Sequence, residues 1–442
     1  MPSPPIDPVE TDETLPARVD VAIIGGGIIG LCTALSLTER GLSVLVCEKG
    51  EIAGEQSSRN WGWCRASRRD PREIALAAEA VQMWSRMNAV VGAETGFRQS
   101  GILFTSDSED ELERCETWLD AARPYQLTSR MVGGAEAARL LDGLQRPVKG
   151  ALYTPGDGRA EPQKAGPAIA GALRRMGATV VARCAVRALD TAGGRVVGIV
   201  TERGRVAADA VVLAGGAWSR LFTMPLDLRL PQLKVHATAL RTGALDGPEG
   251  AAWMSDFAFR KRLDGGYTIA NGASNLVSVV PDSFRFLRDF LPALQLEWRS
   301  LRVRLDGRFR EELQEWTPKA PDEISHFERV RVLDPAPIED MNRAAMAAAA
   351  RAFPAFAKAR IEQQWAGMID VTPDALPVIS GVKSLPGFFI ATGFSGHGFG
   401  IAPAAGRLCA DLVTGSTPLV DPAAFRLSRF SDGSRPRPTT SV

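Results

Sequence analysis

The sequence has few residues of the kinds that build metal centres and disulfide frameworks. Its six cysteines stand singly, without a Cys-x-x-Cys pair, and its three histidines lie far apart. Isolated thiols of this kind argue against a disulfide framework and a zinc site, and they are typical of a reducing compartment. We therefore expect a protein without a bound metal.

Long apolar runs and an excess of charge of one sign are also missing. No run approaches about 18 uninterrupted apolar residues, the length that indicates a membrane span. The 52 lysines and arginines are balanced by 51 aspartates and glutamates, giving a formal net charge of +1. This balance gives no electrostatic reason to expect a nucleic acid or an anionic membrane as partner. Residues 1–18 lack the basic and apolar regions of a signal peptide, so we expect a cytoplasmic protein.

What the sequence does contain is a glycine-rich turn between two apolar segments. Residues 19–24 are apolar and rich in β-branched side chains, as in a strand buried on both faces, and a helical pattern follows the turn. The turn reads Gly25-x-Gly27-x-x-Gly30, and Glu48 ends the next apolar strand 18 residues further on. In a βαβ unit, such glycines allow a pyrophosphate to approach the backbone closely, and the acidic residue binds ribose hydroxyls. The pattern predicts a dinucleotide site.

Two more glycine-rich turns occur between a predicted strand and a predicted helix. They lie in "AVVLAGGAWS" (210–219) and "IATGFSGHGFGIAP" (390–403). Three such turns favour a large cofactor that lies across several loops, with a helix N-terminus near each negative group. The segment "AGEQSSRNWGWCR" (53–65) has neither helical nor strand periodicity. Taken alone, it is typical either of a surface loop or of a segment that runs along the cofactor.

The length of 442 residues and a change of pattern along the chain indicate two interleaved domains. Residues 221–345 hold β-like pieces around a charged helical stretch, whereas the flanking regions hold buried strands and helices. We assign to a cofactor domain residues 19–95, 150–220 and 346–425, and to a substrate domain residues 96–149 and 221–345. We expect flexible tails at residues 1–18 and 426–442.

Four segments in this order resemble the D-amino-acid-oxidase-like (DAO) superfamily of FAD-dependent oxidoreductases. The superfamily includes sarcosine and glycine oxidases and amino-acid dehydrogenases and deaminases. The four segments are residues 20–50, 210–219, 370–380 and 391–400. The likeness spans about residues 19–425 and implies FAD as cofactor. It also implies an α/β fold in which a Rossmann-like FAD-binding domain is interleaved with a mixed-sheet α+β substrate domain.

The resemblance also implies which residues contact FAD. The first glycine turn would hold the pyrophosphate, segment 53–65 would pass from the phosphates to the flavin, and the last glycine turn would lie beside the ring. The residues implied are Gly25, Gly27, Ile28, Ile29, Gly30, Glu48, Lys49, Ser57, Ser58, Arg59, Asn60, Trp61, Gly62, Val186, Gly215, Gly216, Trp218, Gly393, Gly396, His397, Gly398, Phe399 and Gly400.

Two departures from the sarcosine-oxidase branch refine this expectation. That branch attaches its flavin through a cysteine shortly before the Thr-Pro-Asp motif, where this sequence has Met368 and no cysteine. We therefore expect non-covalent FAD. The branch also has a histidine after the paired serines, where Arg59 stands here. This difference argues against simple N-methylglycine chemistry.

The activity implied is oxidation of the C–N bond of an amino acid or related amine by hydride transfer to flavin N5, after which the imine is hydrolysed. His397 would tune the flavin, and an arginine would bind a substrate carboxylate. The candidates for that arginine are Arg65, Arg260, Arg302, Arg304 and Arg308.

Two other functions stay open at this point. One is FAD-dependent oxidation of a C–OH substrate such as a 2-hydroxy acid or glycerol 3-phosphate, for which only His397 stands as a candidate base. The other is a non-catalytic subunit that binds FAD. The sequence also leaves open the substrate and its stereochemistry, the electron acceptor (oxygen or another molecule) and whether the chain forms a homo-oligomer.

Overall fold

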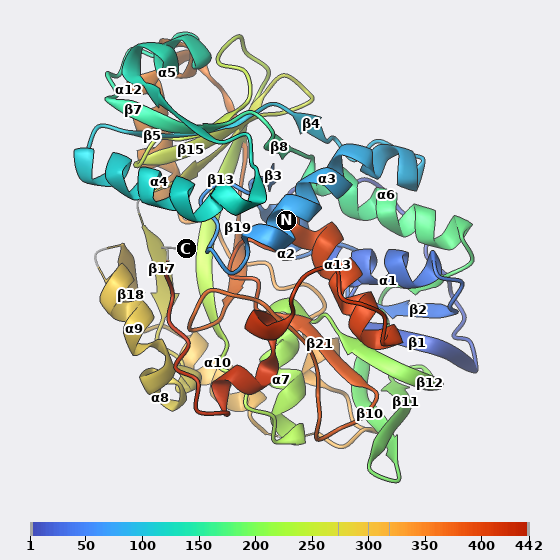
Figure 1. Ribbon diagram of the computed structural model, residues 1–442. Coiled ribbons are helices and arrows are strands. Elements are labelled where there is room, and N and C mark those ends of the chain that lie inside the picture. The colour runs from blue at the N-terminus through green and yellow to red at the C-terminus, as the bar shows by residue number, and fades with distance from the viewer. Residues whose placement is uncertain (1–2, 273, 299, 318, 440–442) are drawn as a thin grey trace.

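The computed structural model describes residues 3–272, 274–298, 300–317 and 319–439, and its helices pack around two large sheets (Figure 1). The first sheet has eight strands, with the order β10-β11-β12-β1-β2-β9 and with β21 paired to both β12 and β20. Its strands are β1 (Arg18–Ile24), β2 (Val44–Cys47), β9 (Thr179–Val181), β10 (Val186–Ala192), β11 (Arg195–Thr201), β12 (Gly204–Leu213), β20 (Val378–Gly381) and β21 (Phe388–Thr392).

Strand β1 lies in the interior of this sheet, and its apolar residues are buried on both faces. It pairs in parallel with β2 and β12, with Ala22 opposite Leu45 and Val211. Val21 and Ile23 belong to a core shared with helices, whereas Ala22 belongs to a second core on the opposite face. Parallel strands buried on both faces are the arrangement that the apolar run predicted.

Four helices cover the helical face of the first sheet. Helix α1 starts directly after the first glycine turn and contacts α6 and α13, and α13 also contacts α3. Figure 1 shows these four helices gathered beside β1 and β2. They are α1 (Ile28–Thr38), α3 (Ile74–Val91), α6 (Pro162–Arg175) and α13 (Gly398–Thr414).

The second sheet has ten strands in the order β18-β17-β13-β16-β15-β14-β5-β7-β6, and β19 pairs with the other edge of β13. Helix α12 (Glu339–Ala352) packs on it through an aromatic core that includes Phe259 and Phe353. The strands are β5 (Ile102–Ser106), β6 (Arg130–Gly133), β7 (Gly150–Thr154), β13 (Leu233–Thr242), β14 (Ala251–Trp253), β15 (Phe257–Lys261), β16 (Tyr267–Asn271), β17 (Asn275–Ser278), β18 (Leu301–Arg304) and β19 (Ile361–Val371).

A small three-stranded sheet lies between the two large ones and consists of β3 (Trp63–Cys64), β4 (Arg98–Gln99) and β8 (Gly158–Arg159). The remaining helices are short or lie on the substrate side. They are α2 (Gln56–Arg59), α4 (Glu109–Ala122), α5 (Gly134–Leu140), α7 (Ser219–Thr223), α8 (Pro281–Arg285), α9 (Leu287–Glu297), α10 (Arg308–Glu315) and α11 (His326–Arg329). In the part of the chain that the structure describes, no helix has the length and apolarity needed to cross a bilayer.

The expected boundaries between the domains differ from the strand pairing in two places. Strand β7 was assigned to the cofactor domain, but it pairs with β5 and β6 in the second sheet. The assignment to the cofactor domain also includes strand β19 and the second half of α12, but β19 pairs within the second sheet and α12 packs against it. Pairing with strands that are distant in the sequence decides to which sheet β7 and β19 belong. The local sequence pattern does not reveal that pairing.

The expected tails also make specific contacts where they are described. The Asp7 backbone N–H donates to the Gln163 carbonyl at 3.0 Å, and Asp12 forms an ion pair with Arg174 at 3.2 Å. Near the other end, Arg429 and Phe430 are buried. Both stretches therefore pack along the first sheet and its helices over part of their length.

Candidate active site between the two sheets

Two cavities that share part of their walls run between the sheets. The outer cavity lies beside the ends of β1, β2 and β12, and its lining includes Glu48 and Val186. The inner cavity continues from it toward β19 and the start of α13. Their shared lining is Gly27, Gln56, Ser57, Ala214 and Gly216. Together they form one elongated space.

The first glycine turn brings the N-terminus of α1 to this space. Gly25 has φ of +111°, and a β-carbon there would lie 2.4 Å from the Ala214 carbonyl oxygen. A β-carbon at Gly30 would lie 2.1 Å from the Gly25 carbonyl oxygen, so α1 packs directly on the turn. The N-cap residue Gly27 has no side chain to satisfy the first helical N–H groups. This end of the helix is suited to an anion.

Glu48 and Lys49 lie at the outer cavity as expected, but their charges have protein partners. The Glu48 carboxylate accepts from the Gly26 N–H at 2.8 Å and the Gly50 N–H at 2.7 Å, and burial raises its pKa. The Lys49 ammonium pairs with Glu55 at 2.8 Å and lies 4.2 Å from the centre of the Trp218 ring. Glu48 is thereby oriented by the backbone, and Lys49 is neutralised.

Segment 53–65 lies along both cavities. Ser57 lines both, and its hydroxyl oxygen accepts from the Ile28 N–H at 2.8 Å. Ser58 is buried and lines neither cavity. Arg59 lines the inner cavity, but its guanidinium pairs with Asp334 at 2.9 Å. Asn60 closes the turn by accepting from the Gly62 N–H at 2.8 Å.

Gly62 is required here by its backbone conformation and by its neighbours. Its φ is +77°, and a β-carbon would lie 2.4 Å from the Ala160 carbonyl oxygen and 2.9 Å from the Arg260 Nε. The close approach that it permits within the protein is therefore to β8 and Arg260. Trp61 and Trp63 flank it edge to face, with ring centres 5.3 Å apart, and both line the inner cavity.

The other two glycine turns meet the same space. Gly215 and Trp218 line the outer cavity, and Gly216 lines both. Gly393 of the last turn lies behind the inner cavity, where a β-carbon would be 2.5 Å from Thr372 Cγ2. The residues of this turn that line the inner cavity are Ala391, Phe394, Ser395, Gly396, His397, Gly398, Phe399 and Gly400.

A buried carboxyl, Asp370, lies at the inner cavity and was not singled out from the sequence. It accepts from the Gly393 N–H at 2.7 Å, the Gln232 amide at 3.0 Å and the Thr392 hydroxyl at 3.2 Å. Burial raises its pKa to about 6. An acidic residue in the apolar run just before Thr372-Pro373-Asp374 is a local signal that could have indicated it.

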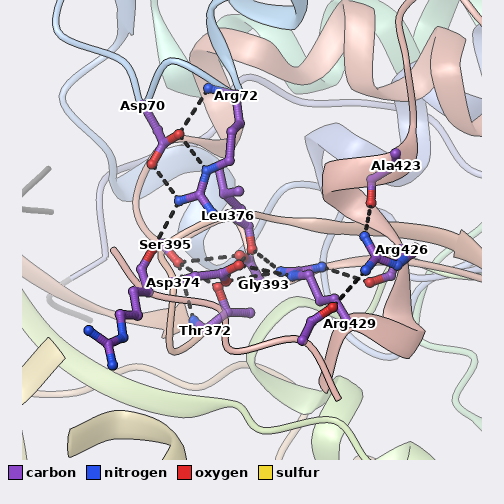
Figure 2. Close-up of polar contacts among 12 residues, drawn as sticks. Asp70, Arg72, Thr372, Asp374, Leu376, Gly393, Ser395, Ala423, Arg426 and Arg429 are labelled. Carbon is purple, nitrogen blue, oxygen red and sulfur yellow. Dashed lines mark hydrogen bonds and ion pairs between the residues drawn. The ribbon is translucent and has the colours of Figure 1, made fainter. Parts of the chain in front are cut away.

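The loop that follows β19, just after Asp370, is held by the C-terminal segment, and Figure 2 shows Arg429 beside Asp374 and Leu376 of this loop. The Asp374 carboxylate, fully buried, receives two hydrogen bonds from Arg429, at 3.0 and 3.1 Å. Arg429 also donates to the Leu376 carbonyl at 2.8 Å. Nearby, Asp70 accepts from the Arg72 guanidinium at the start of α3. We call the pair of Asp374 and Arg429 the loop clamp.

Two arginines, Arg65 and Arg69, lie in the wall of the inner cavity. Arg65 donates to the Ser67 carbonyl, lies 5.1 Å from the centre of the Phe104 ring and forms no ion pair within the described residues. Burial, reinforced by Arg69, holds its pKa well below the usual range. Arg69 was not singled out from the sequence.

Glu73 and His397 complete this group. Glu73 Oε2 lies 3.8 Å from Arg69 Nε and 3.4 Å from His397 Nδ1. Burial opposes its charge, but His397 and Arg69 hold the pKa of Glu73 below its usual value. Burial and Arg69 lower the pKa of His397 to about 4. The i, i+4 spacing of Arg65, Arg69 and Glu73 is the only local signal for the cluster.

The four arginines expected from the substrate domain have other partners and do not line either cavity. Arg260 is buried against Glu161, with 2.7 Å between Nη1 and Oε1. Arg302, Arg304 and Arg308 pair with acidic residues of their own surroundings. Within the described chain, the arginines that line the inner cavity are Arg59, Arg65 and Arg69.

The comparisons with known proteins give the family. The DAO family of FAD-dependent oxidoreductases matches residues 20–412. Glycine oxidase from Pseudomonas aeruginosa is 26% identical over 92% of this chain and 97% of that protein. L-amino acid deaminase from Proteus myxofaciens, solved in complex with anthranilate, is 34% identical, with a TM-score of 0.94 over 97% of each chain. The Proteus vulgaris L-amino acid deaminase is 33% identical, with a TM-score of 0.92 over 96% of this chain and 100% of that one.

The chain therefore belongs to the DAO family and is an FAD-dependent oxidoreductase. The predicted family, fold class and cofactor are confirmed, and so is the predicted class of reaction, oxidation at the C–N bond of an amino acid or related amine. The residues present fit the cofactor, because the elongated space joins a helix N-terminus that has no side chain at its N-cap, an oriented carboxylate at Glu48 and a wider end beside the last glycine turn.

Proposed function

We propose that this protein oxidises an α-amino acid that has a free carboxylate, with FAD bound non-covalently. The observation that carries the proposal is the half-buried Arg65 guanidinium, which lines the inner cavity and forms no ion pair within the described residues. A cation that is partly withdrawn from water is costly unless an anion reaches it. A substrate carboxylate is such an anion, and arginine binds it with two parallel hydrogen bonds.

The same cavity supports the binding site proposed for FAD. Glu48 would bind the ribose, Ser57 and the start of α1 would hold the phosphates, and residues 396–400 would lie beside the ring. When bound, FAD supplies the acceptor for the hydride equivalent. No cysteine is present among the described residues that line the inner cavity, which supports non-covalent attachment.

The protein's own residues would bind, orient and desolvate the substrate. Arg65 would hold the carboxylate, and the aromatic walls Trp61, Trp63 and Phe399 would exclude water from the Cα–H and amine. The N-terminus of α13 at Gly398 would place partial positive charge at the end of the cavity where reduction adds negative charge. Arg59 would fix segment 53–65 through Asp334, since its charge is already paired.

Related proteins support the amino-acid assignment. The glycine oxidase and the two L-amino acid deaminases act on amino acids by name, and anthranilate, which one deaminase binds, is itself an amino carboxylate. We also propose a cytoplasmic location, because all six cysteines are free and buried. For reoxidation of the reduced flavin we propose either oxygen or another electron acceptor.

The test is anaerobic reduction of the purified yellow protein. L- and D-amino acids, their amides and 2-hydroxy acids are added in turn, and the flavin absorbance is followed. We expect bleaching by amino acids of one configuration and by neither their amides nor 2-hydroxy acids at equal concentration. Bleaching by 2-hydroxy acids alone would refute the reaction class. Admitting air then shows whether oxygen reoxidises the flavin.

A further inference from the structure

Three polar side chains meet in the wall of the inner cavity where α3 and α13 begin. Glu73 is completely buried, and its carboxylate is near the guanidinium of Arg69 and the imidazole of His397. Both Glu73 oxygens, Arg69 Nη1 and His397 Nδ1 are buried, and the described part of the chain gives none of them a hydrogen bond of good geometry. Buried polar atoms are nearly always paired, so the unpaired donor Arg69 Nη1 in a residue that lines the cavity indicates a ligand with an acceptor oxygen.

From this cluster we propose that Arg69 is a second specificity-determining residue that binds the substrate carboxylate beside Arg65, and that Glu73 is a positioning residue that holds Arg69 and His397. The inference rests on the proposed function, because it assigns the carboxylate of that substrate to particular groups. It adds two residues that are absent from the glycine turns and from segment 53–65.

The guanidinium of Arg69 has the properties that such a role requires. Arg69 is 3% exposed and lines the inner cavity, and among the described residues its guanidinium makes one hydrogen bond, at 3.5 Å, to the carbonyl of Arg65. This bond uses Nε and leaves Nη1 unpaired and buried. A carboxylate held between Arg65 and Arg69 would give Nη1 the acceptor that the protein does not supply.

The negative charge of Glu73 balances the positive charge of the buried Arg69. Its charge lies 3.8 Å from Arg69 Nε, so the two arginines do not meet the cavity as an unbalanced pair of cations. The other nearby acid, Asp157, is occupied by the backbone N–H groups of Ala66 and Ser67 and by the Ser67 hydroxyl. Glu73 is therefore the acid that balances Arg69.

The same carboxylate orients His397. Since Glu73 Oε2 lies 3.4 Å from Nδ1, the proton of the neutral imidazole belongs on Nδ1, and Nε2 remains the acceptor nitrogen. His397 lines the inner cavity, and its imidazole makes no other polar contact within the described residues. Nε2 is thereby available to accept a hydrogen bond from the substrate amine.

The test is a pair of ligands that differ in the carboxylate. Anthranilate and aniline are titrated into the FAD-loaded protein, and the change in flavin absorption gives each dissociation constant. We expect Arg69→Met to weaken anthranilate binding about ten- to a hundred-fold, the range expected for one charge-assisted hydrogen bond, and to leave aniline binding unchanged. Arg69→Lys should retain part of the anthranilate affinity, since it keeps the charge.

Glu73→Gln tests the positioning role and Arg68→Met is the matched control. Glu73→Gln should weaken anthranilate binding about ten-fold in the wild-type background and not at all in the Arg69→Met background, because the effect passes through Arg69. Arg68 pairs with Glu111 outside the cavity, so Arg68→Met should leave both dissociation constants unchanged.

Equal losses for anthranilate and aniline, or an unchanged anthranilate constant in Arg69→Met, would overturn the inference. Failure of the proposed function has a different signature. If no amino acid bleaches the wild-type flavin but anthranilate binding still depends on Arg69, the carboxylate site stands and the reaction class is wrong. If amino acids bleach wild type and Arg69→Met with the same KM, the assignment of Arg69 is wrong.

Discussion

Breaking the loop clamp should destabilise the protein strongly, because both of its charges are buried. The side chains of Arg429 and Asp374 are 4% and 0% exposed, and two hydrogen bonds join them. Arg429→Met leaves the carboxylate buried without its cation, for which a loss of about 3–5 kcal/mol is expected. With an unfolding entropy of about 2.1 cal/mol/K per residue, a chain of this length that unfolds as one unit should lose about 3–5 °C in Tm.

The measurement is thermal unfolding of the apoprotein and of the FAD-loaded protein. Arg429→Met should lower both Tm values and should release FAD more readily, since the clamped loop directly follows Asp370, which lines the inner cavity at the end of β19. The double variant Arg429→Met/Asp374→Asn should recover at least half of the loss, because no uncompensated charge remains. Arg426→Met, which breaks an exposed pair with Asp432, is the control and should shift Tm by less than about 1 °C. A Tm for Arg429→Met as close to wild type as the control's would refute the reasoning.

Three further substitutions test the cofactor turn and the two buried titratable groups. Gly30→Ala places a β-carbon 2.1 Å from the Gly25 carbonyl oxygen, so it should reduce the FAD content of the protein more than about ten-fold. The ratio of flavin to protein absorbance measures that content. Gly133→Ala is the control, because its β-carbon meets no atom within 4 Å, and it should leave the FAD content unchanged. The pKa of His397 falls from 6.5 to about 4 on folding, so protonation of His397 should destabilise the wild-type protein as the pH falls from 6.5 to 4. Urea unfolding should show that the free energy of unfolding of wild type falls by about 3 kcal/mol relative to that of His397→Gln over this range. The pKa of Asp370 rises from 3.8 to about 6 on folding, so its contribution is lost as pH rises through 6; Asp370→Asn should raise Tm relative to wild type at pH 8 and not at pH 4, and a pH-independent difference would contradict this assignment.

The sequence predicted the parts of the site that are continuous along the chain. The turn at Gly25–Gly30, Glu48 and the segment 53–65 are local patterns, and each lies at the elongated space between the sheets. Contacts between residues that are distant in the sequence could not be predicted. Glu73 meets His397 across more than 300 positions, and nothing near Arg59 in the sequence shows that Asp334 will take its charge.

The domain boundaries were missed for the same reason. An apolar run indicates a buried strand but does not name its partner, and β7 and β19 are placed by pairing with β5 and β13. Choosing among the arginines also required the structure. Five arginines suit a carboxylate equally well by residue type, whereas burial against Glu161 removes Arg260 and exposed pairs occupy Arg302 and Arg304.

The order of strands in the first sheet has a consequence for biosynthesis. Strand β1 can pair with β12, where Ala22 lies opposite Val211, only after β12 has been synthesised. Strand β12 in turn pairs with β21, which is synthesised later still and places Phe388 opposite Val211. While the ribosome makes the intervening chain, the emerging polypeptide exposes unpaired parallel edges and the apolar faces of α1 and α3, which are surfaces that chaperones bind. Helix α13, which completes both the sheet's helical face and the wall beside His397, is made after α1, α3 and α6. Synthesis of β21 and α13 therefore sets the moment at which a nascent molecule can first bind its flavin.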